Sequence, residues 1–140
     1  MFKRNKTQLH PEYNQSDLIK IGMIVEKVNS TEMRINNIII NYYADKNKKE
    51  AFLNDFMFAG RLRLNDKLKI FKAVLKRKNI GYDDSNIENW IKIRNMVAHG
   101  IPVDNNAIVF NGNFYNIEGQ FSNFKKLQLK MDNLLYEAEK

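Results

Sequence analysis

Residues 16–44 read SDLIKIGMIVEKVNSTEMRINNIIINYYA, and this stretch decides the fold. Its apolar residues recur at alternating steps of three and four, the spacing of one face of an α-helix. They are Leu18, Ile21, Val25, Val28, Ile35, Ile39 and Tyr42. The one slot in this stripe without an apolar residue holds Glu32. With Ser16 and Asp17 as suitable N-cap residues, the pattern predicts an amphipathic helix of about seven turns ending near Ala44.

Shorter segments with helical spacing follow, at residues 51–58, 65–78, 85–98 and 120–138. Turn residues separate them, and Gly60, Gly100 and Pro102 are typical of helix ends. Residues 107–117 differ, because two short apolar runs flank Asn111-Gly112, a dipeptide that favours the type I′ turn of a β-hairpin. We therefore expect a mainly all-α fold: an up-and-down bundle of four to five helices with a small β-hairpin before the last helix.

The chain has 140 residues, the length of one ordinary domain. Residues 1–15 show no periodicity and are predicted to form a loosely ordered arm, with residues 16–140 as a single helical domain. The absence of cysteine excludes disulfides, thiolate zinc sites and a cysteine nucleophile. No segment resembles a signal peptide or a membrane span, so we expect a cytoplasmic protein without a membrane partner.

The net charge of +7 is concentrated in one segment. Residues 61–78 hold eight Lys or Arg and one acid, Asp66, which equals the whole excess. On the predicted helix Lys69, Lys72 and Lys76 form a stripe beside the apolar face, and they are candidates for binding a polyanion such as the backbone of RNA. An ordinary solvated lysine-rich face explains the same pattern equally well.

Arg94 lies near the middle of the apolar arc of the helix predicted at 85–98. A guanidinium keeps its charge, so burial requires a fixed anionic partner or a bound anion. One explanation is an ion pair with Glu32, the misplaced acid of the first helix. A second is that the arc forms a subunit interface, and a third is a phosphate site.

His99 is the only histidine besides His10. A neutral imidazole suits proton transfer near pH 7, and an arginine fork matches the oxygens of a phosphate. RNA carries its own nucleophile, so cleavage of RNA requires no cofactor and no metal. On an ideal helix His99 points about 140° away from Arg94. Either the helix unwinds at 98–100, or a second subunit completes the site.

Residues 93–100, IRNMVAHG, resemble the signature of the HEPN superfamily, the nucleotide-binding domain of higher eukaryotes and prokaryotes. Active members carry an arginine, a polar residue, a few variable positions and a histidine. Asn95 takes the polar position, and Ala98 and Gly100 match the common form around the histidine. The long first helix, the basic third helix and the final amphipathic helix extend the resemblance over most of the chain.

The resemblance implies a metal-independent endoribonuclease, usually a homodimer with two Arg-Asn-His sets facing each other across the two-fold axis. His99 would take or return the proton at the ribose 2′-hydroxyl, Arg94 would hold the scissile phosphate, and Asn95 would orient both. The product would carry a 2′,3′-cyclic phosphate.

The implied setting is a toxin–antitoxin, abortive-infection or phage-defence system, with RNA as substrate and a possible antitoxin or partner subunit. Some toxins of this kind are silenced by modification of a tyrosine two residues after the histidine, where this chain has Ile101. Two alternatives stay open. One is a non-catalytic HEPN module that binds nucleic acid or nucleotide or pairs with another protein. The other is a helical interaction protein with Arg94 paired to Glu32.

Overall fold

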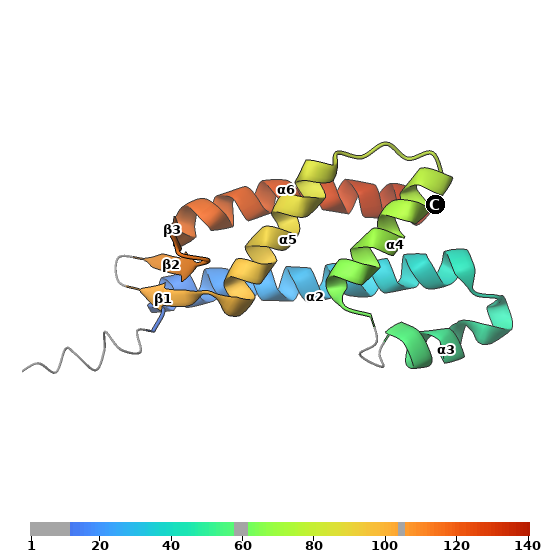
Figure 1. The fold of residues 1–140 in the computed structure, drawn as a ribbon, viewed down its shortest axis with the longest axis horizontal. Helices are drawn as coiled ribbons and strands as arrows, with labels where there is room; N and C mark the ends of the chain where they lie inside the picture. Colours follow the sequence, from blue (N-terminus) through green and yellow to red (C-terminus); the bar gives the residue numbers. More distant parts are fainter. Residues whose placement is uncertain (1–11, 58–61, 104–105) are drawn as a thin grey trace, which may run out of the picture. The chain divides into compact units, whose positions relative to one another are not determined.

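A computed structural model describes residues 12–57, 62–103 and 106–140. The described residues form five α-helices, a short 3-10 helix, a π-helix and three strands. The helices and strands are α2 (Gln15–Tyr43), η1 (Lys46–Lys48), α3 (Lys49–Phe52), η2 (Leu53–Met57), α4 (Leu64–Arg77), α5 (Asp84–His99), β1 (Ile101–Val103), β2 (Ala107–Phe110), β3 (Asn113–Asn116) and α6 (Ile117–Ala138). The predicted mainly-α fold with a small β element before the last helix is confirmed (Figure 1). Most of the predicted arm at 1–15, and the predicted helix end at Gly60, lie outside the described residues.

The chain divides into two compact units. One comprises Met1–Val28 and Asn86–Gln128 and contains the three strands; we call it the sheet unit. The other comprises Asn29–Ser85 and Leu129–Lys140, and we call it the α4 unit.

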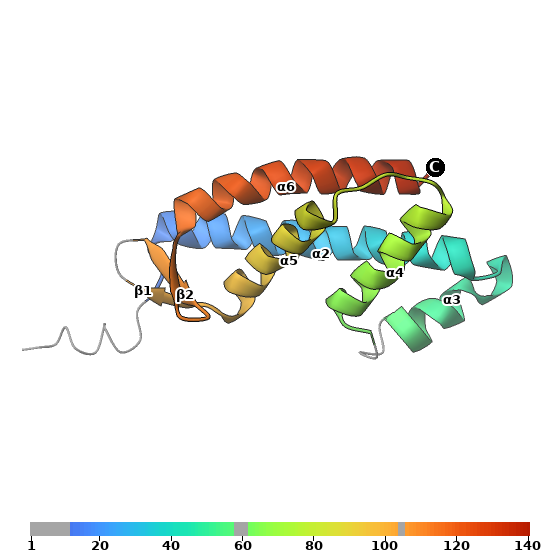
Figure 2. The same ribbon diagram turned by 45° about the horizontal axis from the view of Figure 1, so that its top comes forward.

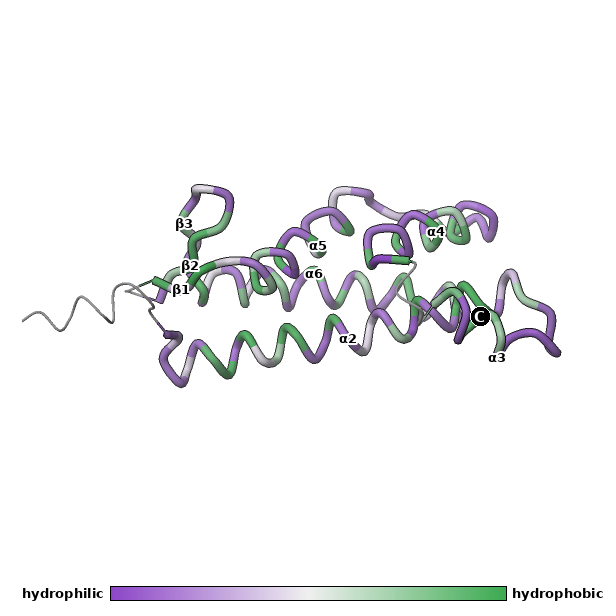
Figure 3. The backbone as a smooth tube through the Cα atoms, turned by 60° about the horizontal axis from the view of Figure 1, so that its bottom comes forward, coloured by the Kyte–Doolittle hydropathy of each residue, from purple (hydrophilic) through white to green (hydrophobic). Residues whose placement is uncertain are grey.

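Helix α2 has the predicted length but begins slightly earlier and buries a shifted face. Its cap is Asn14, whose side-chain Oδ1 accepts a hydrogen bond from the backbone N of Asp17 at 2.8 Å. Ser16 and Asp17, the predicted caps, lie within the first turn. Leu18 and Val25 are exposed, whereas the buried stripe runs through Ile24, Val28, Thr31, Ile35 and Ile39. Figure 3 shows the alternation of hydrophobic and hydrophilic residues along this helix.

The sheet unit contains an antiparallel sheet of order β1-β2-β3. The predicted hairpin is confirmed, since Asn111 (φ 52°) and Gly112 (φ 78°) both have the positive φ that a type I′ turn requires. Strand β1 was not predicted; it pairs with β2 through the partners Ile101 and Val109. The sheet lies at the end of α5 beside the first turns of α2 (Figure 1). Its core cluster is Met96, Ile108 and Ile117, with Tyr13, Ile21, Phe110 and Tyr115 packed against it.

Gly100 joins α5 to this sheet, and its role differs from the predicted helix-stop. Its φ is not in the left-handed region, and its backbone N donates to the carbonyl of Met96 at 2.7 Å. A Cβ at this position would lie 2.5 Å from the Met96 carbonyl O and 2.6 Å from the side chain of Ile108. Glycine is therefore required because β2 approaches the end of α5 too closely for any side chain.

Two polar features of the α4 unit are the ion pair of Arg34 with Glu139 and the left-handed end of α4 at Asn79. Arg34 of α2 donates from Nε and Nη2 to the two carboxylate oxygens of Glu139 at 2.8 and 2.6 Å, where the end of α6 runs beside α2 (Figure 2). These hydrogen bonds lower the pKa of Glu139 and raise that of Arg34. Helix α4 ends with Asn79 at a φ of 59°, and the backbone N of Ile80 reaches the carbonyl of Leu75 at 2.9 Å. Asparagine thus occupies the left-handed helix-end position that glycine often fills.

Candidate functional site at the end of α5

The start and the middle of α5 are firmly anchored. Asp83 caps the helix, accepting hydrogen bonds from the backbone N and the hydroxyl of Ser85 at 3.0 and 2.7 Å, and these bonds lower its pKa. Midway, the buried indole of Trp90 donates to Oε1 of Gln128 on α6 at 2.8 Å. This bond satisfies two buried polar groups at once. The residues from Arg94 onward therefore extend from a fixed helix.

The last turns of α5 are only partly covered, with Met96 as their one buried residue. Ile91 and Ile93 are buried, but Arg94 and Val97 are half-buried and Ala98 is exposed. The apolar arc predicted around Arg94 is thus covered only in its first part. Arg94 consequently has access to solvent, and so to an anionic ligand.

Arg94 and Asn95 are in direct contact. The Arg94 side chain donates from Nη1 to Oδ1 of Asn95 at 3.1 Å. No carboxylate among the described residues of the sheet unit forms an ion pair with Arg94. The contact orients the guanidinium, and the described residues of this unit show no hydrogen bond from its other donors.

Glu32, the partner proposed for Arg94 on sequence grounds, has a partner within the α4 unit. Its Oε2 accepts a hydrogen bond from Nζ of Lys67 at 2.6 Å, and the Lys67 side chain is only 4% exposed. Lys67 belongs to the basic segment at 61–78 and was not predicted to pair with Glu32. The sequence did contain a signal for this ion pair, because Lys67 takes an apolar position of α4 between Leu64 and Phe71.

His99 is exposed and lies in the last turn of α5. Of the two sequence alternatives, unwinding at 98–100 is wrong: α5 extends through His99, and Gly100 bonds to Met96 as the helix would require. His99 lies five positions after Arg94 in a regular helix, which turns their side chains about 140° apart. One chain therefore does not direct both side chains to the same point.

Lys92, Asn95 and His99 share one face of α5, because they lie three and four residues apart. The ammonium of Lys92 lies 5.9 Å from the centre of the Tyr115 ring on β3, in a cation–π contact. Lys92 was not predicted as a site residue, since nothing along the chain connects it with residue 115. This contact links the His99 face of the helix to the sheet.

The lysine stripe of α4 is only partly available. Lys69 and Lys76 are exposed, whereas Lys72 forms an ion pair with Oδ1 of Asp84 at 2.6 Å. Two of the three predicted RNA-binding lysines thus present free surface in the α4 unit.

Within the described ranges, no three His, Cys, Asp or Glu side chains gather closely enough to hold a metal ion. No helix in the same ranges combines the length and apolar character needed to cross a membrane. Comparison of the chain with models of known families, with curated proteins and with solved structures finds no match.

Proposed function

We propose that the chain is a HEPN-type endoribonuclease that cleaves RNA without a metal ion, through attack of a ribose 2′-hydroxyl on the adjacent phosphate. The observation that carries the proposal is the Arg94–Asn95 contact at the solvent-accessible end of α5, with the exposed His99 one turn further on. A half-buried arginine held by an amide, rather than neutralised by an acid of its own unit, suits a phosphate ligand.

In this mechanism His99 exchanges the proton of the 2′-hydroxyl, and Arg94 stabilises the charge that develops on the phosphate oxygens. Asn95 keeps the guanidinium in position through its Oδ1. The reaction forms a bond from the 2′-oxygen to phosphorus and breaks the bond to the 5′-oxygen, which leaves with a proton. The products are a 2′,3′-cyclic phosphate and a free 5′-hydroxyl.

The divergence of Arg94 and His99 favours a site built from two copies of the chain. In a homodimer with α5 at the two-fold axis, each histidine would work with groups of the other copy. The exposed Ala98 fits such a contact, because a small side chain permits close approach of two helices. A toxin or phage-defence role, with an antitoxin or partner subunit, follows from the same resemblance and belongs to the proposal.

The test is cleavage of total cellular RNA in EDTA by the wild type, by His99→Ala and by Asn89→Ala, all purified identically. Asn89 is an exposed residue of α5 and serves as the matched control. We expect the wild type and Asn89→Ala to leave cyclic-phosphate ends and His99→Ala to leave none. Equal cleavage by all three would reveal a contaminant, and no cleavage by a folded dimer would contradict the proposal.

One observation favours a second candidate, a non-catalytic module that binds nucleic acid. A regular helix through His99 holds the candidate catalytic groups of a single chain apart, while Lys69 and Lys76 remain exposed. Salt-dependent binding of RNA without cleavage, in monomer and dimer alike, would support this candidate.

A further inference from the structure

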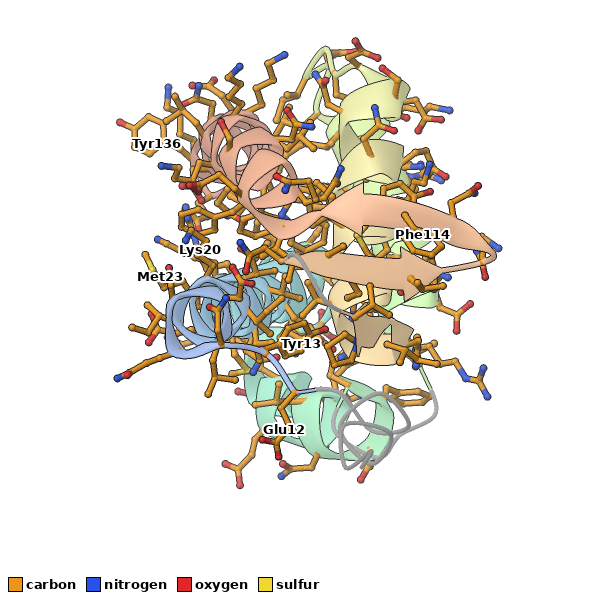
Figure 4. The ribbon with its side chains drawn as sticks, turned by 90° about the vertical axis from the view of Figure 1, so that its left-hand side faces the viewer. Glu12, Tyr13, Lys20, Met23, Phe114 and Tyr136 are labelled. Carbon is orange, nitrogen blue, oxygen red and sulfur yellow. The ribbon has the colours of Figure 1, made fainter. Side chains whose placement is uncertain are left out.

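The tip of the hairpin formed by β2 and β3 is open to solvent. Asn111, Gly112 and Asn113 are all exposed, and nothing lies within 4 Å of a Cβ built on Gly112. Phe114, the next residue, is 75% exposed, and Figure 4 shows it on the ribbon of β2 and β3 that projects from the helices. Water and hydroxide ion therefore have free access to the peptide bond between Asn111 and Gly112.

Asn111 is the one asparagine of the chain that precedes a glycine. Asparagine is a thermally labile residue, because the backbone N of the following residue can attack its Cγ. Glycine in the following position leaves this approach unobstructed, since it has no Cβ. Among the described residues, neither the Asn111 side chain nor the backbone N of Gly112 has a hydrogen-bond partner. Both reacting groups are thus unengaged.

Two other asparagines provide a comparison within the same chain. Asn79 and Asn106 share the left-handed conformation of Asn111, with φ of 59° and 58° against 52°. After Asn79, the backbone N of Ile80 is engaged, because it donates to a carbonyl of α4 at 2.9 Å. Asn106 accepts a hydrogen bond at Oδ1 from Nδ2 of Asn14 and precedes an alanine. Asn111 is therefore distinguished by its unengaged groups and its glycine neighbour, and not by its backbone conformation.

We propose that Asn111 is a site of spontaneous modification, which converts it to aspartate and isoaspartate and so loosens the sheet with time. The backbone N of Gly112 loses its proton to hydroxide and forms a bond to Cγ of Asn111. The bond from Cγ to Nδ2 breaks, and ammonia leaves with a proton taken from water. Water then opens the cyclic imide, giving aspartate by attack at Cγ and isoaspartate by attack at the main-chain carbonyl. This inference does not depend on the proposed function.

The two products differ in their effect on the hairpin. Aspartate tolerates the left-handed conformation as asparagine does, so it keeps the turn. Isoaspartate adds one carbon atom to the main chain, which a two-residue type I′ turn does not accommodate. The closing pair of Phe110 and Asn113 is then disturbed, and with it the strand that holds Ile108 against Met96 in the core cluster. Met96 belongs to α5, so the change reaches the helix that carries the candidate site.

The experiment incubates the folded chain at neutral and at mildly alkaline pH and follows each asparagine by peptide mass spectrometry. We expect a mass gain of one unit at Asn111 before any gain at Asn79 or Asn106. The rate should rise with pH, because hydroxide removes the Gly112 proton. The net charge should fall by one from +7, which cation-exchange chromatography resolves. An equal or higher rate at Asn79 or Asn106, or no modification at Asn111, would overturn the proposal.

A matched variant separates the new charge from the longer main chain. Asn111→Asp carries the charge of the product on an ordinary backbone, so it should keep the melting temperature of the freshly purified chain. The isoaspartyl fraction of the incubated protein should melt at a lower temperature than Asn111→Asp. Equal melting temperatures of these two forms would show that the sheet is not loosened, and would overturn the proposed consequence.

Discussion

Substitution of Gly100 by alanine should destabilise the junction between α5 and the sheet, and the decrease in the free energy of unfolding can be worked out from the structure. The new Cβ would meet the Met96 carbonyl O at 2.5 Å and two atoms of the Ile108 side chain at 2.6 Å. The carbonyl cannot retreat without weakening the helical hydrogen bond from Gly100, which is 2.7 Å long. Ile108 cannot retreat because it is buried against Met96 and Ile117.

Overpacking of this kind costs about 1 to 3 kcal/mol, and loss of one backbone hydrogen bond adds about 1 kcal/mol. We therefore expect the free energy of unfolding to fall by about 2 to 4 kcal/mol. For a chain of this length the melting temperature should drop by about 6 to 16 °C.

The assay is denaturant unfolding followed by far-UV circular dichroism, with Gly22→Ala as the control. Gly22 lies in α2, and nothing lies within 4 Å of a Cβ built there. Alanine is the better helix former, so Gly22→Ala should stabilise by about 0.5 to 1 kcal/mol. If Gly100→Ala were within 0.5 kcal/mol of the wild type, as judged against an error of about that size, the steric reasoning would be refuted.

Two further predictions concern ion pairs of the α4 unit. Lys67→Met should lower the free energy of unfolding by about 2 to 3 kcal/mol, less than for a fully buried pair because the Glu32 side chain is 29% exposed. The double variant with Glu32→Gln should recover part of this loss in a double-mutant cycle. Strict additivity of the two substitutions would argue against the pair. Arg34 lowers the pKa of Glu139 below its ordinary 4.5, so the pair stabilises the folded state above pH 4.5 and this contribution is lost as the pH falls through the lowered pKa. Unfolding midpoints measured against pH should therefore show an acid-side decrease in the wild type that is smaller in Glu139→Gln, and identical slopes would contradict the assignment.

The helices could be predicted because the features that determine them are local in the sequence. The three-and-four spacing on α2 and the capping potential before α5 depend on residues a few positions apart. The hairpin was predictable for the same reason, since Asn111-Gly112 alone favours a turn with two positive φ angles. Where errors occurred at helix ends, as with Asn14 and Ser16, neighbouring residues offered equally good capping groups.

Strand β1 could not be predicted because it forms by pairing with β2, which comes later in the chain. Gly100 and Pro102 are ordinary stop signals, and only the close approach of Ile108 shows that the chain continues into a sheet. The partner of Glu32 was missed similarly, since choosing between Arg94 and Lys67 requires knowing which helices pack together. Periodicity also could not show that the apolar arc of α5 emerges from the core near Ala98.

The candidate site was predicted as a set of residues but not as an arrangement. Arg94, Asn95 and His99 were identified from their chemistry and their spacing, and the Arg94–Asn95 contact joins two of them. That α5 remains helical through His99 is decided by the Met96–Gly100 hydrogen bond and the packing beneath it. A motif of eight residues contains no information on that packing.

The position of Pro102 in the centre of β1 bears on self-association. The outer side of an edge strand invites another chain to pair with it, and a proline supplies no backbone donor for such pairing. β1 has three residues and proline is the middle one, so growth of the sheet from this edge is blocked. Under stress, strand addition between molecules should therefore begin at β3, where Asn113–Asn116 offers four unblocked residues and no charge to deter aggregation.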